Sequence, residues 1–235
     1  MMQRSLVLDL LELRQRCIYV CLWFVFFFLG FFFLAHELFY LLIKPLLTIT
    51  PAPAYLIATQ IASPLVTPLC LAADASFLCT MPFALFQLWR FCKPGLYTQE
   101  RFILRWGSFF SVALFLIGMV FCYYAILPWM LHYFANSVPK GVRYLPEISN
   151  TVNFITHMLL IFGLCFQVPL FTWLIIRLEL CSYQQLIILR PYIIVFAFII
   201  GMLLTPPDVF SQILLAVPLC LLFESGLLLA RLFPR

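Results

Sequence analysis

The chain alternates between long stretches without a charged side chain and short segments where Arg, Lys, Asp and Glu gather. The uncharged stretches are Cys17–Ala35, Pro45–Ala73 followed by Ala75–Trp89, Trp106–Pro139, Ile148–Ile176, Pro191–Pro207 and Val209–Phe223. They show neither the period of two of a half-buried strand nor the polar face of a water-exposed helix. Backbone groups in a bilayer must bond within their own segment, so the stretches predict transmembrane helices rather than a barrel.

Six spans are the simplest count, and the last two are short. The final stretches hold 17 and 15 residues. At about 1.5 Å of rise per residue they reach roughly 23–26 Å, less than the roughly 30 Å of a hydrocarbon core. They predict two short spans or a re-entrant hairpin. We expect residues 1–235 to form a single all-α polytopic membrane domain.

Composition supports a bilayer environment. Hydrophobic residues make up 65% of the chain and charged residues 10%, with 27 Phe and a mean hydropathy of +1.09. A soluble domain could not bury so much apolar surface. Prolines inside the stretches predict kinked helices; they are Pro68, Pro82, Pro128, Pro169 and Pro218.

The distribution of basic residues predicts the orientation. In a six-span frame only three of the 14 Lys and Arg residues, Lys44, Lys140 and Arg143, fall on the side opposite the termini. By the positive-inside rule both termini face the cytoplasm or a mitochondrial matrix. The net charge of +5 is therefore a topology signal, and nucleic acid binding is not needed to explain it.

Metal and cofactor sites are not expected. The nine cysteines include no C-x-x-C pair and the three histidines are far apart in sequence, which favours free structural thiols. No G-x-x-x-x-G-K-[ST] motif is present, so nucleotide-driven turnover is not expected. The first apolar stretch follows a charged segment and no small-residue cleavage site follows it, so we expect a retained helix rather than a signal peptide.

Two acids on the inward side are candidates for binding a guanidinium. Glu12 and Glu100 stand beside the membrane, where each could accept charge-assisted hydrogen bonds from an arginine. Structural roles are also open. Glu12 can pair with Arg16 one helical turn away, and Glu100 can sit in the first turn of a helix, where the dipole favours an acid.

Polar groups inside the membrane are functional candidates by default, because they are costly there. Asp74, Gln167 and Glu224 lie in apolar surroundings, and Asp208 separates the last two stretches. In T-P-P-D the prolines break one helix and Asp208 can cap the next one.

Several ordered motifs resemble one family. They are L-E-L-R at 11–14, K-P-L at 44–46, S-P-L-V-T-P at 63–68, F-x-x-P-G-L-Y-x-x-E-R at 91–101, F-Q-V-P at 166–169 and G-M-L-L-T-P-P-D-V-F-S-Q at 201–212. In this order and frame the chain resembles the TatC family of twin-arginine protein translocases over nearly its whole length.

The resemblance implies a glove-shaped bundle of six helices that binds twin-arginine signal peptides on its inward face. The acids carried over for recognition are Glu12 and Glu100. The residues implied to shape the same site are Arg14, Phe91, Pro94, Leu96, Tyr97 and Arg101. Residues implied at partner or intramembrane positions are Pro45, Gln167, Asp208 and Gln212. The family often has Glu where Gln167 stands, which puts a protonation role there in doubt.

The resemblance also implies partners and an energy source. They are folded cargo, TatA-like and TatB-like single-span subunits, further copies of the chain and the proton-motive force. Alternatives are a solute transporter or channel and a structural subunit of a respiratory complex. The high Phe content and low charge favour the mitochondrial inner membrane, with a folded Rieske Fe–S protein as cargo; the bacterial plasma membrane is the alternative.

Overall fold

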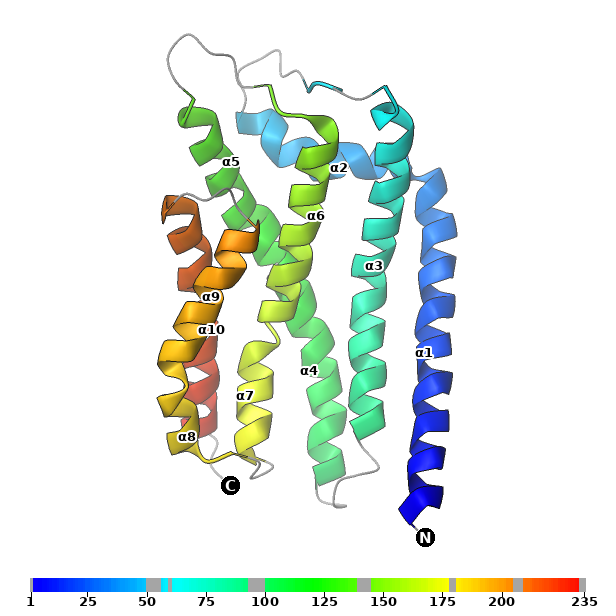
Figure 1. The fold of residues 1–235 in the computed structure, drawn as a ribbon, viewed down its shortest axis with the longest axis vertical. Helices are drawn as coiled ribbons and strands as arrows, with labels where there is room; N and C mark the ends of the chain where they lie inside the picture. The colour runs from blue at the N-terminus through cyan, green and yellow to red at the C-terminus, as the bar shows by residue number, and fades with distance from the viewer. Residues whose placement is uncertain are drawn as a thin grey trace. The chain divides into compact units, whose positions relative to one another are not determined.

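The structure is a computed structural model that describes residues 2–49, 56–58, 61–92, 100–138, 145–177, 181–204 and 209–232. Within these ranges, only the backbone is described for residues 2–9, 45–49, 91–92, 100–105, 204 and 211. The helices are α1 (Met2–Phe33), α2 (Ala35–Ile49), α3 (Ser63–Cys92), α4 (Glu100–Phe121), the π-helical η2 (Cys122–Ile126), α5 (Leu127–Asn136), α6 (Ile148–Cys165), α7 (Val168–Arg177), α8 (Tyr183–Ile188), α9 (Arg190–Leu204) and α10 (Val209–Leu232). Figure 1 shows this order along the chain. The all-α prediction is confirmed.

The apolar stretches correspond to the long helices. Within the described residues, five helical segments are long and apolar enough to cross a membrane: Leu10–Phe33, Ser63–Arg90, Trp106–Asn136, Ile148–Arg177 and Gln212–Leu232. The segment Arg190–Leu203 is apolar but shorter, as predicted for the fifth span. The last helix is longer than predicted, with 24 residues. It continues through Glu224, whose charge had ended the uncharged stretch.

Two prolines interrupt helices and explain two changes of element. Proline lacks an N–H, and its ring collides with the carbonyl four residues before it. Pro169 therefore follows the end of α6 at Cys165, and α7 begins at Val168. Pro128 follows η2, where the wider π-helical turn accommodates the ring. Pro68 and Pro82 in α3, by contrast, lie inside a continuous helix.

The chain forms two compact units, which we describe separately. The first comprises residues 1–44, 56–113 and 146–156. In it α1 and α3 lie side by side and antiparallel (Figure 1), with the rings of Trp23 and Phe83 5.3 Å apart. A parallel bridge joins Ile57 to Glu147 at the start of α6.

The second unit comprises residues 45–55, 114–145 and 157–235. Its helices α7 and α9 both pack on α10. Gly226 of α10 has no room for a side chain, because a Cβ there would lie 1.9 Å from Oγ1 of Thr172 on α7. The capping box of Ser182 and Gln185 starts α8, which satisfies two backbone N–H groups that would otherwise lack partners.

Candidate functional site

The predicted acid Glu12 lies on α1, one turn before Arg16. Residues four apart share a face of a helix, so their side chains meet. Arg16 donates to Oε1 of Glu12 from Nε at 3.0 Å and from Nη2 at 2.5 Å. The prediction that these two residues pair is confirmed.

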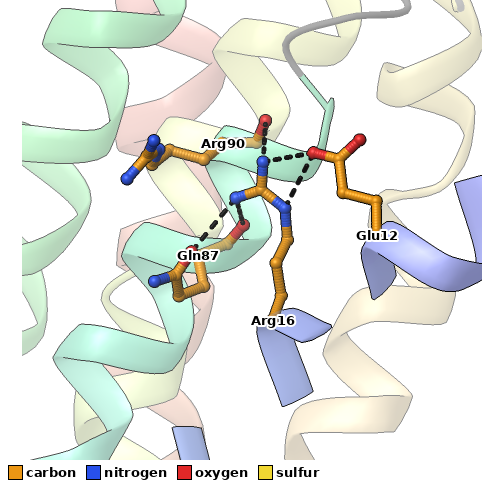
Figure 2. Close-up of polar contacts among 4 residues, drawn as sticks. All are labelled: Glu12, Arg16, Gln87 and Arg90. Atoms are coloured by element: carbon orange, nitrogen blue, oxygen red, sulfur yellow. Dashed lines mark hydrogen bonds and ion pairs between the residues drawn. The ribbon is translucent and has the colours of Figure 1, made fainter. Parts of the chain in front are cut away.

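Arg16 also bonds to the last turns of α3. Its Nη1 donates to Oε1 of Gln87 at 3.0 Å and to the Gln87 carbonyl at 3.4 Å, and Nη2 donates to the Arg90 carbonyl at 3.4 Å. The Arg90 carbonyl is among the last four of α3, which lack intrahelical partners and carry partial negative charge, and this suits a guanidinium. Figure 2 shows the Arg16 guanidinium between Glu12 and the end of α3.

These contacts use the full donor capacity of Arg16. A guanidinium has five N–H groups, and Arg16 makes five hydrogen bonds. Its side chain is only 16% exposed. Arg16 therefore acts as a bracket that holds α1 against the end of α3 and has no donor left for a ligand.

Glu12 is more accessible than its partner. Its side chain is 40% exposed, and both bonds from Arg16 go to Oε1. In the described part of the chain Oε2 receives no hydrogen bond, and in Figure 2 it points away from Arg16. A carboxylate with one oxygen held and one accessible can accept hydrogen bonds from an incoming cation.

The other residues predicted for signal binding lie on α1 near Arg16 or between the last turn of α3 and the start of α4 in the sequence. Arg14 is exposed on α1. Phe91 lies in the last turn of α3 and Glu100 and Arg101 begin α4, although their side chains lie outside the description. Three further predicted residues lie outside the described residues altogether: Pro94, Leu96 and Tyr97.

The residues predicted at partner or intramembrane positions belong to the second unit. Gln167 is buried, with 2% of its surface exposed, at the break between α6 and α7. Gln212 lies in α10 beside α9, where a Cβ at Gly201 would be 3.4 Å from the Gln212 carbonyl. Pro45 lies in α2 without a described side chain, and Asp208 with its predicted cap lies outside the described residues.

Two acids within apolar segments have polar partners. The Thr156 hydroxyl on α6 donates to Oδ2 of Asp74 on α3 at 2.7 Å. Arg190 at the start of α9 pairs with Glu224 of α10 at 2.8 Å, with both side chains about 40% exposed. Each contact joins two helices of one unit, so both acids have a structural role in the fold.

An apolar groove lies between α1 and α3, farther along the two helices than Arg16. It encloses about 310 Å³ and is lined by Val20, Cys21 and Phe24 of α1 and by Phe77, Thr80, Met81 and Ala84 of α3. The Thr80 hydroxyl donates to the Ser76 carbonyl at 2.7 Å. The lining is therefore apolar throughout.

Sequence reasoning treated Arg16 only as a possible partner of Glu12 and missed Gln87. The signal for Gln87 was a polar side chain close to the end of an otherwise apolar stretch, three residues before Arg90. Among the described residues no three of His, Cys, Asp and Glu come together in a way that could hold a metal ion.

Comparison with known proteins identifies close relatives. The sequence pattern of the family "Sec-independent protein translocase protein (TatC)" matches residues 9–218. The TatC protein of Haemophilus influenzae is 40% identical over 230 residues, which cover 98% of this chain and 90% of the relative. TatC of Escherichia coli is 37% identical over 98% of this chain and 89% of its own length.

A solved structure has the same fold. The crystal structure of the twin-arginine translocase receptor TatC superposes with a TM-score of 0.85 and 30% sequence identity. The match covers 97% of this chain and all of that chain.

Proposed function

The chain belongs to the TatC family of Sec-independent protein translocase proteins, and on that premise we propose that it is the signal-recognition core of a twin-arginine translocase. It binds the arginine pair of a signal peptide and takes part in moving the folded cargo across an energy-coupled membrane. The two compact units act together as one membrane domain in this role.

The observation that supports this proposal most directly is the geometry of Glu12. Its carboxylate is held by Arg16 through one oxygen and keeps the other accessible. Arginine suits such an acceptor because its planar guanidinium donates in a fixed fork, whereas lysine is a compact point charge. Recognition by Glu12 therefore favours arginine over lysine and weakens as salt screens the pair.

Glu100 supplies the second acid. It begins α4, the helix that follows α3 in the chain, and the Arg16 bracket attaches to the end of α3. In the proposed complex Glu12 and Glu100 each accept one arginine of the pair. Phe91 at the end of α3, Arg101 at the start of α4 and the intervening Pro94, Leu96 and Tyr97 position the peptide, together with Arg14.

Family membership supports a proposal for the wider assembly. TatA-like and TatB-like single-span subunits bind near Asp208 and Gln212, several copies of the chain assemble in one complex, and the proton-motive force drives transport. We propose no enzymatic turnover.

The multi-pass membrane location is clear from the apolar helices, and we place the protein in a bacterial plasma membrane. The relatives named above are bacterial, which favours this location over the mitochondrial inner membrane that the composition suggested. A high Phe content and low charge are common to polytopic membrane proteins and do not identify an organelle.

Deleting the gene and following a folded reporter with a twin-arginine signal tests the proposal. Export should stop in the deletion strain and return with the wild-type gene, while a reporter with a twin-lysine signal stays inside in both. Solute uptake and respiration should not change. Loss of uptake or respiration with intact export would point to a transporter or a respiratory subunit instead.

A further inference from the structure

Asp74 of α3 is an acid deep in an apolar span with a single polar contact. It stands eleven residues after Ser63, where α3 begins, which is about 16 Å along the helix and close to the middle of a roughly 30 Å hydrocarbon core. Among the described residues it accepts one hydrogen bond, from the Thr156 hydroxyl to Oδ2, and forms no ion pair. An ionised carboxylate at this depth is costly unless it is paired.

The helices of the first unit supply little charge around Asp74. Asp, Glu, Lys and Arg are absent from residues 17–33 of α1, 106–113 of α4, 148–156 of α6 and, apart from Asp74 itself, 63–89 of α3. The nearest titratable groups in sequence are Cys70 and Cys79 on α3 and His157, next to Thr156, on α6. Those of α1 after Arg16 and of α2 are all exposed: Cys17, Tyr19, Cys21, His36, Glu37, Tyr40 and Lys44. No described neighbour therefore balances the charge of an ionised Asp74.

Thr156 can serve both protonation states of the acid. Its Oγ1 lies 2.7 Å from Oδ2 of Asp74 and 3.1 Å from the Asn153 carbonyl. A hydroxyl has one hydrogen and two acceptor lone pairs, so it donates to one of these oxygens at a time. When the acid is ionised, Thr156 donates to Oδ2. When the acid is protonated, Oδ2 donates to Oγ1 and Thr156 donates to the Asn153 carbonyl. Either state is hydrogen-bonded in the geometry observed.

Two buried hydroxyls lie between the start of α3 and Asp74. Ser63 and Thr67 are each 4% exposed, and among the described residues neither hydroxyl oxygen has a hydrogen-bond partner. They are one turn apart and Thr67 is two turns from Asp74, so all three share one face of the helix. Buried hydroxyls without a protein partner are places where ordered water binds. The roughly 10 Å from Thr67 to Asp74 would be spanned by about three waters in file.

The opposite direction along α3 lacks such groups. The hydroxyls of Ser76 and Thr80 donate to carbonyls four residues earlier in the same helix, those of Ala72 and Ser76. Their hydrogens are therefore already used, whereas those of Ser63 and Thr67 are available to water. The polar path leads from Asp74 toward the start of α3 and not toward its end.

We propose that Asp74 is a proton-binding site inside the membrane, reached by water from the end of α3 at Ser63. A hydronium ion gives its proton to the carboxylate and leaves as water, and Thr156 then turns its hydrogen from Asp74 to the Asn153 carbonyl. By the predicted topology Ser63 lies on the side opposite the termini, so Asp74 responds to the pH of that side. The site goes beyond the proposed function and does not depend on signal recognition.

Labelling with dicyclohexylcarbodiimide tests the site. A neutral carboxyl gives its proton to one nitrogen of this apolar reagent while the carboxylate oxygen bonds to the central carbon, so the whole reagent is added and is located by mass spectrometry. The full-length protein is labelled in vesicles whose pH is set separately on the two sides. We expect labelling of Asp74 to rise as the pH falls on the Ser63 side alone. Asp74→Asn should abolish it, and labelling of Glu224, which is paired with Arg190, should not follow the pH of that side.

Variants of Thr156 test the relay. Thr156→Val removes the only described hydrogen bond to the ionised acid, so the proton should be held to higher pH. The midpoint of labelling should rise by about one pH unit, which corresponds to the loss of roughly one hydrogen bond. Thr156→Ser keeps the hydroxyl and should restore the wild-type profile. If Thr156→Val does not insert, the profile of the wild type still decides.

A small thiol reagent tests the water path. Methyl methanethiosulfonate reacts with thiolates, and a thiolate forms where the thiol meets water. Thr67→Cys should therefore react when the reagent is added on the Ser63 side, although Thr67 is buried. Leu69→Cys is the matched control, because Leu69 is 43% exposed on the apolar surface of the same helix, and it should stay unmodified.

Each part of the proposal can fail separately. Absence of label from Asp74 at every pH at which the wild type stays inserted overturns the proton site. Labelling that follows the pH on the side of the termini, or a Thr67→Cys thiol as inert as that of Leu69→Cys, overturns the water path. An unchanged profile in inserted Thr156→Val overturns the relay. None of these results bears on signal recognition, because Glu12 and Glu100 are not part of this site.

Discussion

Removing the Arg16 bracket should loosen the attachment of α1 to α3. The helical pair with Glu12 contributes about 0.3–0.5 kcal/mol because the acid is partly in solvent. The 3.0 Å bond to Oε1 of Gln87 is a good charged hydrogen bond, worth about 1.5 kcal/mol at the low end of its range. The two 3.4 Å bonds to carbonyls add little. We therefore expect Arg16→Gln to lower the free energy of unfolding by about 2 kcal/mol.

The assay is thermal unfolding of the purified protein in detergent. For a chain of this length, 1 kcal/mol corresponds to roughly 2–4 °C, so Arg16→Gln should lower Tm by about 4–8 °C. Arg16→Lys should lose about half as much, because an ammonium has three donors and no planar fork with which to reach both helices. Gln15→Ala is the matched control, since within the described residues its amide bonds only to the exposed Tyr19 hydroxyl, and its Tm should stay close to that of the wild type.

A double-mutant cycle makes the test specific. Gln87→Leu removes the Oε1 acceptor on α3. The double variant with Arg16→Gln should therefore lose about 1 kcal/mol less free energy of unfolding than the sum of the two single variants. Additive effects, or a wild-type Tm for Arg16→Lys, would refute the bracket and leave Arg16 as an ordinary surface charge.

Two helix contacts give further predictions by the same unfolding assay. Thr156→Val should lower the free energy of unfolding by about 1–3 kcal/mol because it removes the hydrogen bond to Asp74. Adding Asp74→Leu in the same background should recover most of this loss. No recovery would show that the contact does not stabilise the fold. Gly226→Ala should lower the free energy of unfolding by about 1–3 kcal/mol because its Cβ would overlap the Thr172 hydroxyl. Thr172→Ala should relieve part of this cost, and full tolerance of Gly226→Ala alone would contradict the close packing of α7 on α10.

The fold could be predicted well because its determinants are local. Bilayer length and backbone bonding require helices where a long uncharged stretch crosses the membrane, and the ring of Pro169 explains the break after Cys165. The length of the last helix was underestimated because its uncharged stretch ends at Glu224. The Arg190–Glu224 pair joins residues 34 positions apart, and such a partner cannot be read from a local pattern.

The candidate site shows the same division between local and distant contacts. A spacing of four residues was enough to predict the Glu12–Arg16 pair. The contact of Arg16 with Gln87 spans 71 residues and depends on how α1 packs against α3, which hydropathy does not specify. The roles of Glu100 and the loop that precedes it come from family resemblance and stay predictions.

The measurement that tests the central claim most directly is crosslinking of a twin-arginine signal peptide, photoreactive beside its arginine pair, to membranes that contain the wild type, Glu12→Ala or Glu100→Ala. The amount of inserted protein is measured in parallel. We predict a strong crosslink to the wild type and its loss in each variant at equal insertion. A crosslink that persists undiminished in the double variant, or that is absent from the wild type, would contradict recognition of the arginine pair by these two acids.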